Sequence, residues 1–322
     1  MKANKKLISI VIPMYNEEEV ISETYTRLCV VIKEASLACE IIFVDDSSTD
    51  TTFSVVSAIA SRDKRVKVIR FSRNFGHQAA LSAGLESAKG DAVISMDADL
   101  QHPPEIIPKL ISKWCEGYEV VYTVREYDKN TGVLKRLTSS LFYSVISRLA
   151  RFEIPAGGAD FRLYDRKAVA TINALQERSR FLRGLSAWVG FRQTSVNYMA
   201  GVRAAGESKY TAGRMLGLAI DGITSFSIFP LKISIYLGFT VSFLSFFYLC
   251  YVLYVALLTD EAVQGWASTT VTLLFLGGVQ LIAIGILGEY IGRIYEEIKR
   301  RPTYIVTERL GFKKDDKQEN KD

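Results

Sequence analysis

Ala92-Val93-Ile94-Ser95-Met96-Asp97-Ala98-Asp99-Leu100-Gln101 is the stretch of sequence from which the fold can be worked out. Its apolar first half predicts a short buried strand, and oxygen-bearing side chains follow at alternate positions, Asp97, Asp99 and Gln101. A hard cation such as Mg2+ prefers oxygen ligands, and one or two carboxylates plus the phosphates of a substrate commonly complete its shell. The stretch therefore indicates a site for a divalent cation and a nucleotide diphosphate. Taken alone, it is more often ordinary turn and helix-capping chemistry.

Short apolar strands alternate with helical segments through the first half of the chain. This alternation predicts an α/β fold with a parallel sheet covered on both faces, in which ligands bind at the carboxyl ends of the strands. The predicted strands are Leu7 to Pro13, Glu40 to Asp45, Val66 to Phe71 and Ala92 to Asp97. Their ends carry the polar clusters Tyr15-Asn16-Glu17, Asp45-Asp46-Ser47-Ser48, Ser72-Arg73-Asn74 and Asp97 to Gln101. Four such clusters at one edge favour a ligand site over an isolated turn.

Several classes of site are excluded by what the sequence lacks. A Rossmann dinucleotide site needs Gly-x-Gly-x-x-Gly after the first strand, where this chain has Pro13-Met14-Tyr15-Asn16-Glu17. Two histidines and no Cys-x-x-Cys do not suit zinc, and four cysteines without paired spacing indicate a reducing compartment. A nucleotide must be held another way, with Asp45 or Asp46 as a candidate partner for base or ribose. The alternative for this cluster is the N-cap of the next helix.

The middle of the chain is basic, although the whole chain has a net charge of only +5. Residues 125–214 contain 16 Lys and Arg against 7 Asp and Glu. This surplus favours a phosphate-rich partner or an anionic membrane surface over a merely solvated basic face. The segment from about Val120 to Tyr210 is predicted to form a further strand, helices and a turn from Gly157 to Arg162, and to receive a second substrate.

Two long apolar stretches follow, Ile233 to Leu258 with 26 residues and Trp266 to Leu287 with 22, and neither contains a charge. At a rise of about 1.5 Å per residue, each can cross a hydrocarbon core of about 30 Å, so both are predicted to be transmembrane helices. The link between them has Asp260 and Glu261 but no Lys or Arg, whereas basic residues flank the hairpin. By the positive-inside tendency, both termini are expected in the cytoplasm.

These patterns divide the chain into four predicted parts. Residues 1–210 form a cytoplasmic catalytic domain, and 211–230 form an interfacial amphipathic helix. Residues 231–290 contain the two transmembrane helices, and 291–322 form a cytoplasmic segment that ends in a disordered tail.

Several long motifs, in order, resemble family 2 glycosyltransferases of the GT-A fold, and in particular the polyprenyl-phosphate branch of that family. The resemblance covers nearly everything from Leu7 to Tyr304. The motifs that carry it are Ile10 to Glu17, Val44 to Asp50, Arg73 to Gln78, Met96 to Pro104, Asp160 to Leu163, Gly206 to Tyr210 and Leu287 to Tyr295.

The resemblance implies roles for individual residues. Asp160 would lie close to the reacting centre, or would be a structural turn aspartate paired with Arg162. Asp97, Asp99 and Gln101 would surround Mg2+ or Mn2+ and the diphosphate, with Asp99 as the first candidate for direct metal contact. The remaining implied residues are Pro13, Tyr15, Glu17, Asp46, Asp97, Ala98 and Arg125 around the nucleotide sugar, and Arg203 and Lys209 on a basic loop that closes over the phosphates.

The implied reaction is an inverting transfer of a sugar from a nucleotide sugar to undecaprenyl phosphate at the inner (cytoplasmic) membrane. UDP-glucose is the first expected donor, before UDP-N-acetylglucosamine, a modified pentose or GDP-mannose. The resemblance also implies a homotetramer, with a flippase and a downstream transferase as partners and no nucleic acid. Two alternatives remain: a processive polysaccharide synthase, disfavoured because Gln-x-x-Arg-Trp is missing, and an inactive membrane-anchored scaffold that binds nucleotide sugars.

Overall fold

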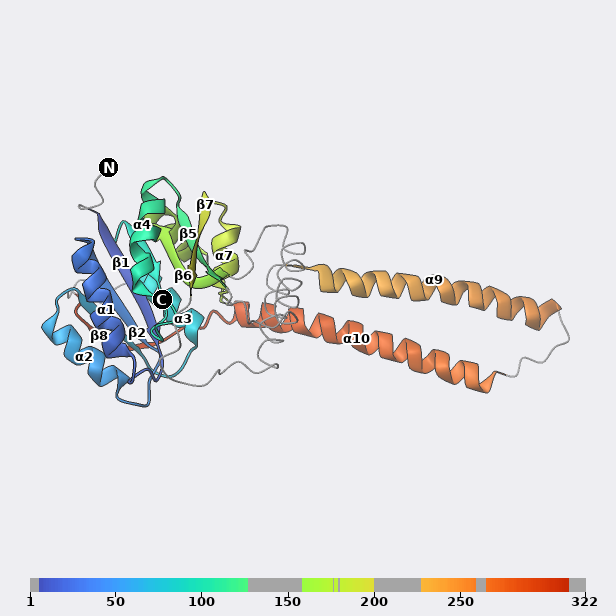
Figure 1. Cartoon of the computed structure of the whole chain (residues 1–322). Coiled ribbons are helices and arrows are strands. Elements are labelled where there is room, and N and C mark those ends of the chain that lie inside the picture. The colour runs from blue at the N-terminus through green and yellow to red at the C-terminus, as the bar shows by residue number, and fades with distance from the viewer. Residues whose placement is uncertain are drawn as a thin grey trace. The chain divides into compact units, whose positions relative to one another are not determined.

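The computed structural model describes residues 6–126, 158–175, 177–178, 180–199, 227–258 and 265–312. The chain divides into two compact units (Figure 1). The first unit consists of Met1–Ala219 together with Pro302–Asp322, and the second is Ile220–Arg301.

The first unit is built on an eight-stranded sheet with the order β7-β5-β6-β4-β1-β2-β3-β8. Its central strands are nearly continuous apolar runs, and every residue of β1 from Ile8 to Met14 is buried. Burial on both faces is what such a run predicts. The strands are β1 Leu7–Met14, β2 Ala38–Asp45, β3 Val66–Phe71, β4 Ala92–Ser95, β5 Val120–Glu126, β6 Gly158–Asp165, β7 Gln193–Met199 and β8 Val306–Leu310.

The predicted α/β sheet is confirmed, and its strand directions are mixed. Strands β1, β2, β3 and β4 pair in parallel, as do β5 and β7. Strand β6 is antiparallel to both β4 and β5, and β8 is antiparallel to β3. The register places Met14 beside Asp45 and Val11 beside Ser95, so the carboxyl ends of β1, β2 and β4 meet at one edge of the sheet.

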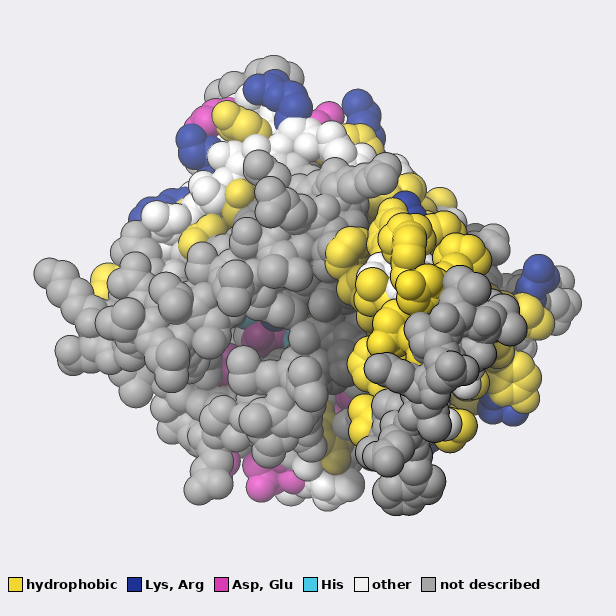
Figure 2. All heavy atoms as spheres, turned by 90° about the vertical axis from the view of Figure 1, so that its right-hand side faces the viewer, with side chains coloured by type: hydrophobic (Ala, Val, Ile, Leu, Met, Phe, Trp, Pro, Cys, Tyr) yellow, Lys and Arg dark blue, Asp and Glu magenta, His cyan; other side chains and the backbone are white. Residues whose placement is uncertain are grey.

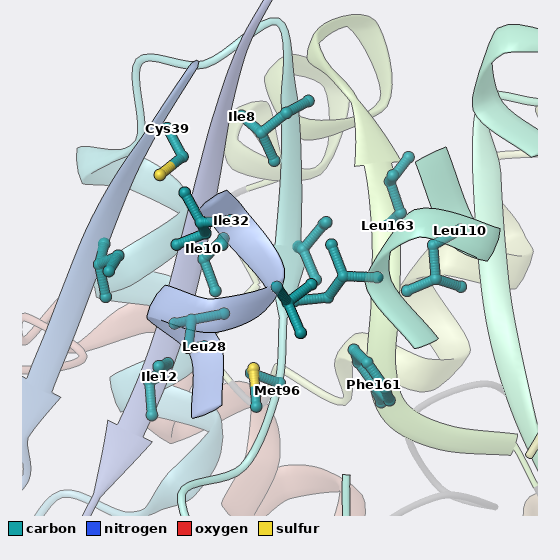
Figure 3. Close-up of a cluster of buried hydrophobic side chains, with 14 of the residues drawn as sticks. Ile8, Ile10, Ile12, Leu28, Ile32, Cys39, Met96, Leu110, Phe161 and Leu163 are labelled. Atoms are coloured by element: carbon teal, nitrogen blue, oxygen red, sulfur yellow. The ribbon is translucent and has the colours of Figure 1, made fainter. Parts of the chain in front are cut away.

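Helices flank this sheet (Figure 1). Ile8, Ile10 and Ile12 of β1 belong to one apolar core with residues from α1 and α4, and Figure 3 shows Leu28 and Ile32 of α1 beside these isoleucines. The helices of this unit are α1 Ile21–Glu34, α2 Thr52–Arg62, α3 His77–Ser87, α4 Ile107–Cys115, α6 Arg166–Ala174 and α7 Leu182–Trp188, with a short 3-10 turn at Pro104–Ile106.

Helix α3 packs against β1 at very short range through a glycine. A Cβ atom built at Gly84 would lie 2.1 Å from Cγ1 of Val11, whose side chain alternates with those of Ile10 and Ile12 along the strand. Alternate residues of a strand point to opposite faces, so α3 covers the face of β1 opposite α1. A glycine at this position therefore allows α3 to pack closely against β1.

The second unit contains the helices α9, Phe229–Leu258, and α10, Trp266–Ile298. Two spans in them, Phe229–Tyr248 and Val271–Ile298, are long and apolar enough to cross a membrane. Large hydrophobic side chains on both helices are exposed, and Figure 2 shows hydrophobic side chains gathered over this part of the molecule. The predicted pair of long apolar helices is confirmed, and α10 continues past the predicted end at Leu287.

A short strand follows α10 and belongs to the first unit. Strand β8 adds to the free edge of β3, with Ile69 beside Arg309, and the backbone N–H of Ser72 donates to the carbonyl of Ile305 at 3.0 Å. The sequence did not predict this strand. The predicted interfacial helix, 211–230, lies outside the described residues up to position 226, and its end overlaps the start of α9 at Phe229. The predicted tail, 313–322, also lies outside the described residues.

Candidate active site

The loops after β1 and β2 are tied to each other at the carboxyl edge of the sheet. The backbone N–H of Asn16 donates to Oγ of Ser48 at 3.0 Å, and Oδ1 of Asn16 accepts from the backbone N–H of Thr49 at 2.8 Å. Asn16 has a φ of 55°, which these bonds hold in the left-handed region. The predicted nucleotide residues lie on this segment, with Pro13 buried in β1 and Tyr15 and Glu17 half-buried beyond it.

Asp46, predicted to contact the nucleotide, also anchors the loop before α3. It is only 3% exposed, and its two carboxylate oxygens accept from the backbone N–H groups of Phe75 at 2.7 Å and Gly76 at 2.8 Å. Burial raises the pKa of Asp46 above its ordinary value. This carboxylate therefore joins the end of β2 to the start of α3, and its role toward a nucleotide stays a prediction.

The Asp97 to Gln101 segment forms a compact loop after β4. The hydroxyl of Thr24 in α1 donates to the carbonyl of Ala98 at 2.7 Å, and the backbone N–H of Gln101 donates to Oδ1 of Asp99 at 3.1 Å. The amide oxygen of Gln101 accepts from Arg125 at 3.3 Å. The structure thus brings together the predicted residues Asp99, Gln101 and Arg125 at one edge.

Asp97 contacts both histidines of the chain. Its Oδ1 lies 2.8 Å from Nε2 of His77, and its Oδ2 lies 3.4 Å from Nδ1 of His102. The backbone N–H of Asp97 donates to that same Nδ1 at 2.9 Å, which fixes His102 as an acceptor there. Burial opposes ionisation of Asp97, but the hydrogen bond from His77 and the charge of that imidazole hold the pKa of the Asp97 carboxyl below its ordinary value.

Asp160 lies in strand β6 and pairs with Arg183 at the start of α7. Two charge-assisted hydrogen bonds of 2.7 Å join the guanidinium to both carboxylate oxygens, and Asp160 is 7% exposed. Burial alone would raise the pKa of this carboxyl, but Arg183 holds it well below its ordinary value. The alternative of a turn aspartate paired with Arg162 is wrong, because Asp160 is a strand residue with another partner.

Arg162 instead fastens α7 to β6. It is 1% exposed, and its guanidinium donates to the carbonyl of Ala159 at 2.9 Å and to the hydroxyl of Ser186 in α7. The hydroxyl of Ser95 in β4 donates to the carbonyl of Asp160 at 2.5 Å, which fixes β6 from its other side. These contacts set where Arg183 meets Asp160.

His77 brings the two carboxylates into one cluster. It is the first residue of α3, and its Nδ1 lies 4.0 Å from Oδ2 of Asp160 while its Nε2 contacts Asp97. Partial shielding of the ring from water disfavours the imidazolium, but the hydrogen bond and charge of Asp97, with the charge of Asp160, raise the pKa of His77 to about 9. Near neutral pH, the cluster therefore contains two carboxylates and two cations, His77 and Arg183.

Sequence reasoning missed the roles of His77 and Arg183. The only signal for His77 was its place in the Arg73 to Gln78 motif, and Arg183 was one of many basic residues in the middle of the chain. The predicted Arg203 and Lys209, with the basic residues Lys135, Arg136, Arg148 and Arg151, lie outside the described residues.

The donor set after β4 suits a hard divalent cation that shares its shell with phosphates. Among the residues that the structure describes, no three His, Cys, Asp or Glu side chains gather in a group that could hold a metal. The protein would therefore supply one or two carboxylates, Asp97 and Asp99, as is usual for Mg2+, with phosphates and water as the other ligands.

Two family models match this chain. Residues 9–172 match the model described as glycosyl transferase family 2, and residues 229–294 match the one described as the GtrB C-terminal hairpin. The first match contains the strand-end loops, His77 and Asp160, and the second covers α9 and most of α10.

Similar proteins match nearly the whole chain. An uncharacterized glycosyltransferase, YkcC of Bacillus subtilis (strain 168), is 47% identical over 94% of this chain and 94% of that protein. The SfII prophage-derived bactoprenol glucosyl transferase of Shigella flexneri is 44% identical over 93% of this chain and 97% of that protein. Among solved structures, mannosyl-3-phosphoglycerate synthase from Rubrobacter xylanophilus gives a TM-score of 0.48 at 19% identity, covering 67% of this chain and 71% of that one. The family matches and the first two relatives lead to one conclusion: this chain belongs to glycosyl transferase family 2 and is a glycosyltransferase of the GT-A fold.

Proposed function

We propose that this glycosyltransferase moves a sugar from a nucleotide sugar to a polyprenyl phosphate, with UDP-glucose as the first donor to test. One observation carries the proposal: the Asp97–His77–Asp160–Arg183 cluster lies at the strand ends of a chain 44% identical to a bactoprenol glucosyl transferase over 93% of its length. Bactoprenol is a polyprenol, and its phosphate is the acceptor that this likeness supports. UDP-N-acetylglucosamine, a modified pentose nucleotide and GDP-mannose are the other donors.

The proposed transfer depends more on the positioning of donor and acceptor than on a strong general base. A phosphate oxygen of the acceptor attacks the anomeric carbon as the bond from that carbon to the diphosphate breaks, so the configuration inverts. The acceptor phosphate is already an anion near neutral pH, so no side chain has to remove a proton from it. Asp160, held ionised by Arg183, would orient groups at the reacting centre.

The leaving diphosphate carries negative charge that must be balanced. A divalent cation held by Asp97, Asp99 and Gln101 would act as Lewis acid and template when bound. Arg125 lies beside Gln101 and would meet the same phosphates. Arg203 and Lys209 keep their proposed role as further cations over the diphosphate.

The hairpin would bring the enzyme to a lipid acceptor. Helices α9 and α10 are proposed to cross the cytoplasmic membrane, because each contains an apolar span long enough to cross the bilayer core. Lys299, Arg300 and Arg301 follow α10, whereas the link between the helices contains no Lys or Arg, which supports cytoplasmic termini. Assembly as a homotetramer, and work beside a flippase and a downstream transferase, are part of the same proposal.

The test is transfer by the purified full chain to polyprenyl phosphate from a panel of radiolabelled nucleotide sugars. We expect label in the lipid phase, loss of activity with a chelator, and recovery with Mg2+ or Mn2+. Asp99→Ala should lower the rate on the order of 10²- to 10³-fold, as for other lost electrostatic contacts at reacting centres. Asp91→Ala, the same substitution just before β4, is the matched control and should keep activity.

Three results would count against the proposal. Failure of every donor to label the lipid would favour the inactive scaffold. Full turnover by Asp99→Ala would remove the metal assignment. Equal transfer to a soluble acceptor would remove the proposed reason for the hairpin.

A further inference from the structure

Glu86, near the end of α3, binds two segments that are far away in the sequence. Its Oε1 lies 3.0 Å from the guanidinium of Arg180, and its Oε2 accepts a hydrogen bond from the hydroxyl of Tyr304. Arg180 stands three residues before Arg183, and Tyr304 comes after α10, just before β8. A single carboxylate thus joins the chain that leaves the hairpin to the chain that leads into α7.

Tyr304 is held in place by more than its hydroxyl. Its ring stacks on Phe71 of β3, with centroids 4.9 Å apart and planes 15° apart, and its neighbour Ile305 accepts the hydrogen bond from Ser72. Loss of the hydroxyl alone would therefore leave the ring and β8 in position. The link from Tyr304 to Glu86 can be tested separately from the strand.

Helix α3 connects this link to the candidate site. At its first turn, the amide oxygen of Gln78 accepts from the backbone N–H of Leu182, the first residue of α7, at 3.0 Å. At its other end, Glu86 holds Arg180. Helix α3 therefore contacts the start of α7 and the segment just before it. Helix α7 contains Arg183, which binds Asp160.

We propose that Glu86 is a positioning residue that couples Tyr304, in the segment after the hairpin, to Arg183 and His77 at the active site. The inference rests on the proposed transfer reaction, because it assigns a supporting element to the same site. The Glu86 side chain is 35% exposed, and ion pairs at such partly exposed positions add little to stability. Glu86 therefore contributes mainly to the positions of Arg183 and His77, and its loss should lower the transfer rate more than the stability of the fold.

The experiment compares two conservative variants with matched controls in the full chain. Tyr304→Phe removes the hydroxyl and keeps the ring, and Glu86→Gln removes the charge and keeps the shape. Tyr25→Phe removes a tyrosine–carboxylate bond to Asp63, and Glu116→Gln removes an ion pair with Lys113, both elsewhere in the unit. Because small misplacements of reacting groups lower rates steeply, we expect kcat to fall about three- to tenfold in the first two variants, with donor KM nearly unchanged. The controls should match the wild type, and all four should unfold thermally close to it.

A second measurement does not depend on transfer. His77 and His102 are the two histidines of the chain, so histidine labelled with 13C at Cε1 gives one signal from each ring in the detergent-purified protein, and His77→Gln assigns them. We expect Tyr304→Phe and Glu86→Gln to move the His77 signal by more than Tyr25→Phe does. Unchanged His77 signals in both variants, or a kcat loss that merely follows a fall in unfolding temperature, would overturn the coupling. A wild type that transfers no sugar would refute the proposed function, and the His77 signals would still decide the coupling.

Discussion

Variants of the Asp160–Arg183 pair can show whether Asp160 contributes to stability, to the transfer reaction, or to both. Its members meet through two hydrogen bonds of 2.7 Å, with Asp160 nearly buried and the side chain of Arg183 29% exposed. Removing one partner of a fully buried pair costs about 3–5 kcal/mol, because the other charge stays buried alone. The exposure of Arg183 reduces this figure, so Arg183→Gln should cost about 2–3 kcal/mol of stability.

Asp160→Asn should cost less, because Arg183 can turn toward water. We expect about 1–2 kcal/mol for this variant. The double variant removes both charges, so its cost should fall short of the sum of the single costs by about 1–2 kcal/mol, a usual coupling for residues in contact. For a domain of this size, about 2–4 °C accompanies each kcal/mol, so Arg183→Gln should unfold about 4–12 °C below the wild type.

The measurements are the unfolding temperatures and transfer rates of the wild type, Asp160→Asn, Arg183→Gln and the double variant, which together form a double-mutant cycle. If Asp160 acts at the reacting centre, all three variants should be at least about 100-fold slower than the wild type, including the double variant, in which neither charge is left buried alone. Recovery of transfer in the double variant would make Asp160 purely structural. Strictly additive unfolding losses would show that the two residues are not coupled, and the geometric argument would then be refuted.

Two further predictions concern α3. The raised pKa of His77, about 9 against an ordinary 6.5, means that its stabilising contribution is fully present below pH 6.5 and is lost as the pH rises toward 9. The unfolding temperature should therefore fall more over this range in the wild type than in His77→Gln, and parallel curves would contradict the assignment. Gly84→Ala should destabilise the first unit by about 1–3 kcal/mol, because its Cβ would overlap Val11, whereas Gly277→Ala has open space around it and should unfold like the wild type.

The parallel half of the sheet could be predicted because its strands are apolar runs, and such runs indicate burial on both faces. The apolar runs of β1 and β2 are buried on both faces, as their composition indicates. Strand β6 gave no such signal: Gly158, Asp160 and Arg162 look like a turn, yet they lie in an antiparallel strand between β4 and β5. The polar side chains are tolerated there because Asp160 finds Arg183 and Arg162 finds α7, contacts that no local pattern contains.

The candidate site was predictable where one loop supplies it. Asp97, Asp99 and Gln101 are neighbours in sequence, so their shared location follows from a single strand end. The Asp160–Arg183 pair and the His77 contacts join three separate elements, and only the packing of α3 and α7 brings them together. Edge strand β8 was equally invisible, because Glu308 and Arg309 resemble an ordinary charged segment.

Strand β8 also imposes an order on the maturation of this enzyme. Ile69 finds its partner Arg309 only after the chain has been synthesised through both helices of the hairpin. Pairings between residues so distant in sequence form late, because a long loop must close first. Until then, β3 presents an open edge of unpaired backbone groups, a known template for association between chains. A nascent chain that stalls before Val306 would therefore be prone to aggregate, and the catalytic sheet is the last part of the protein to be completed.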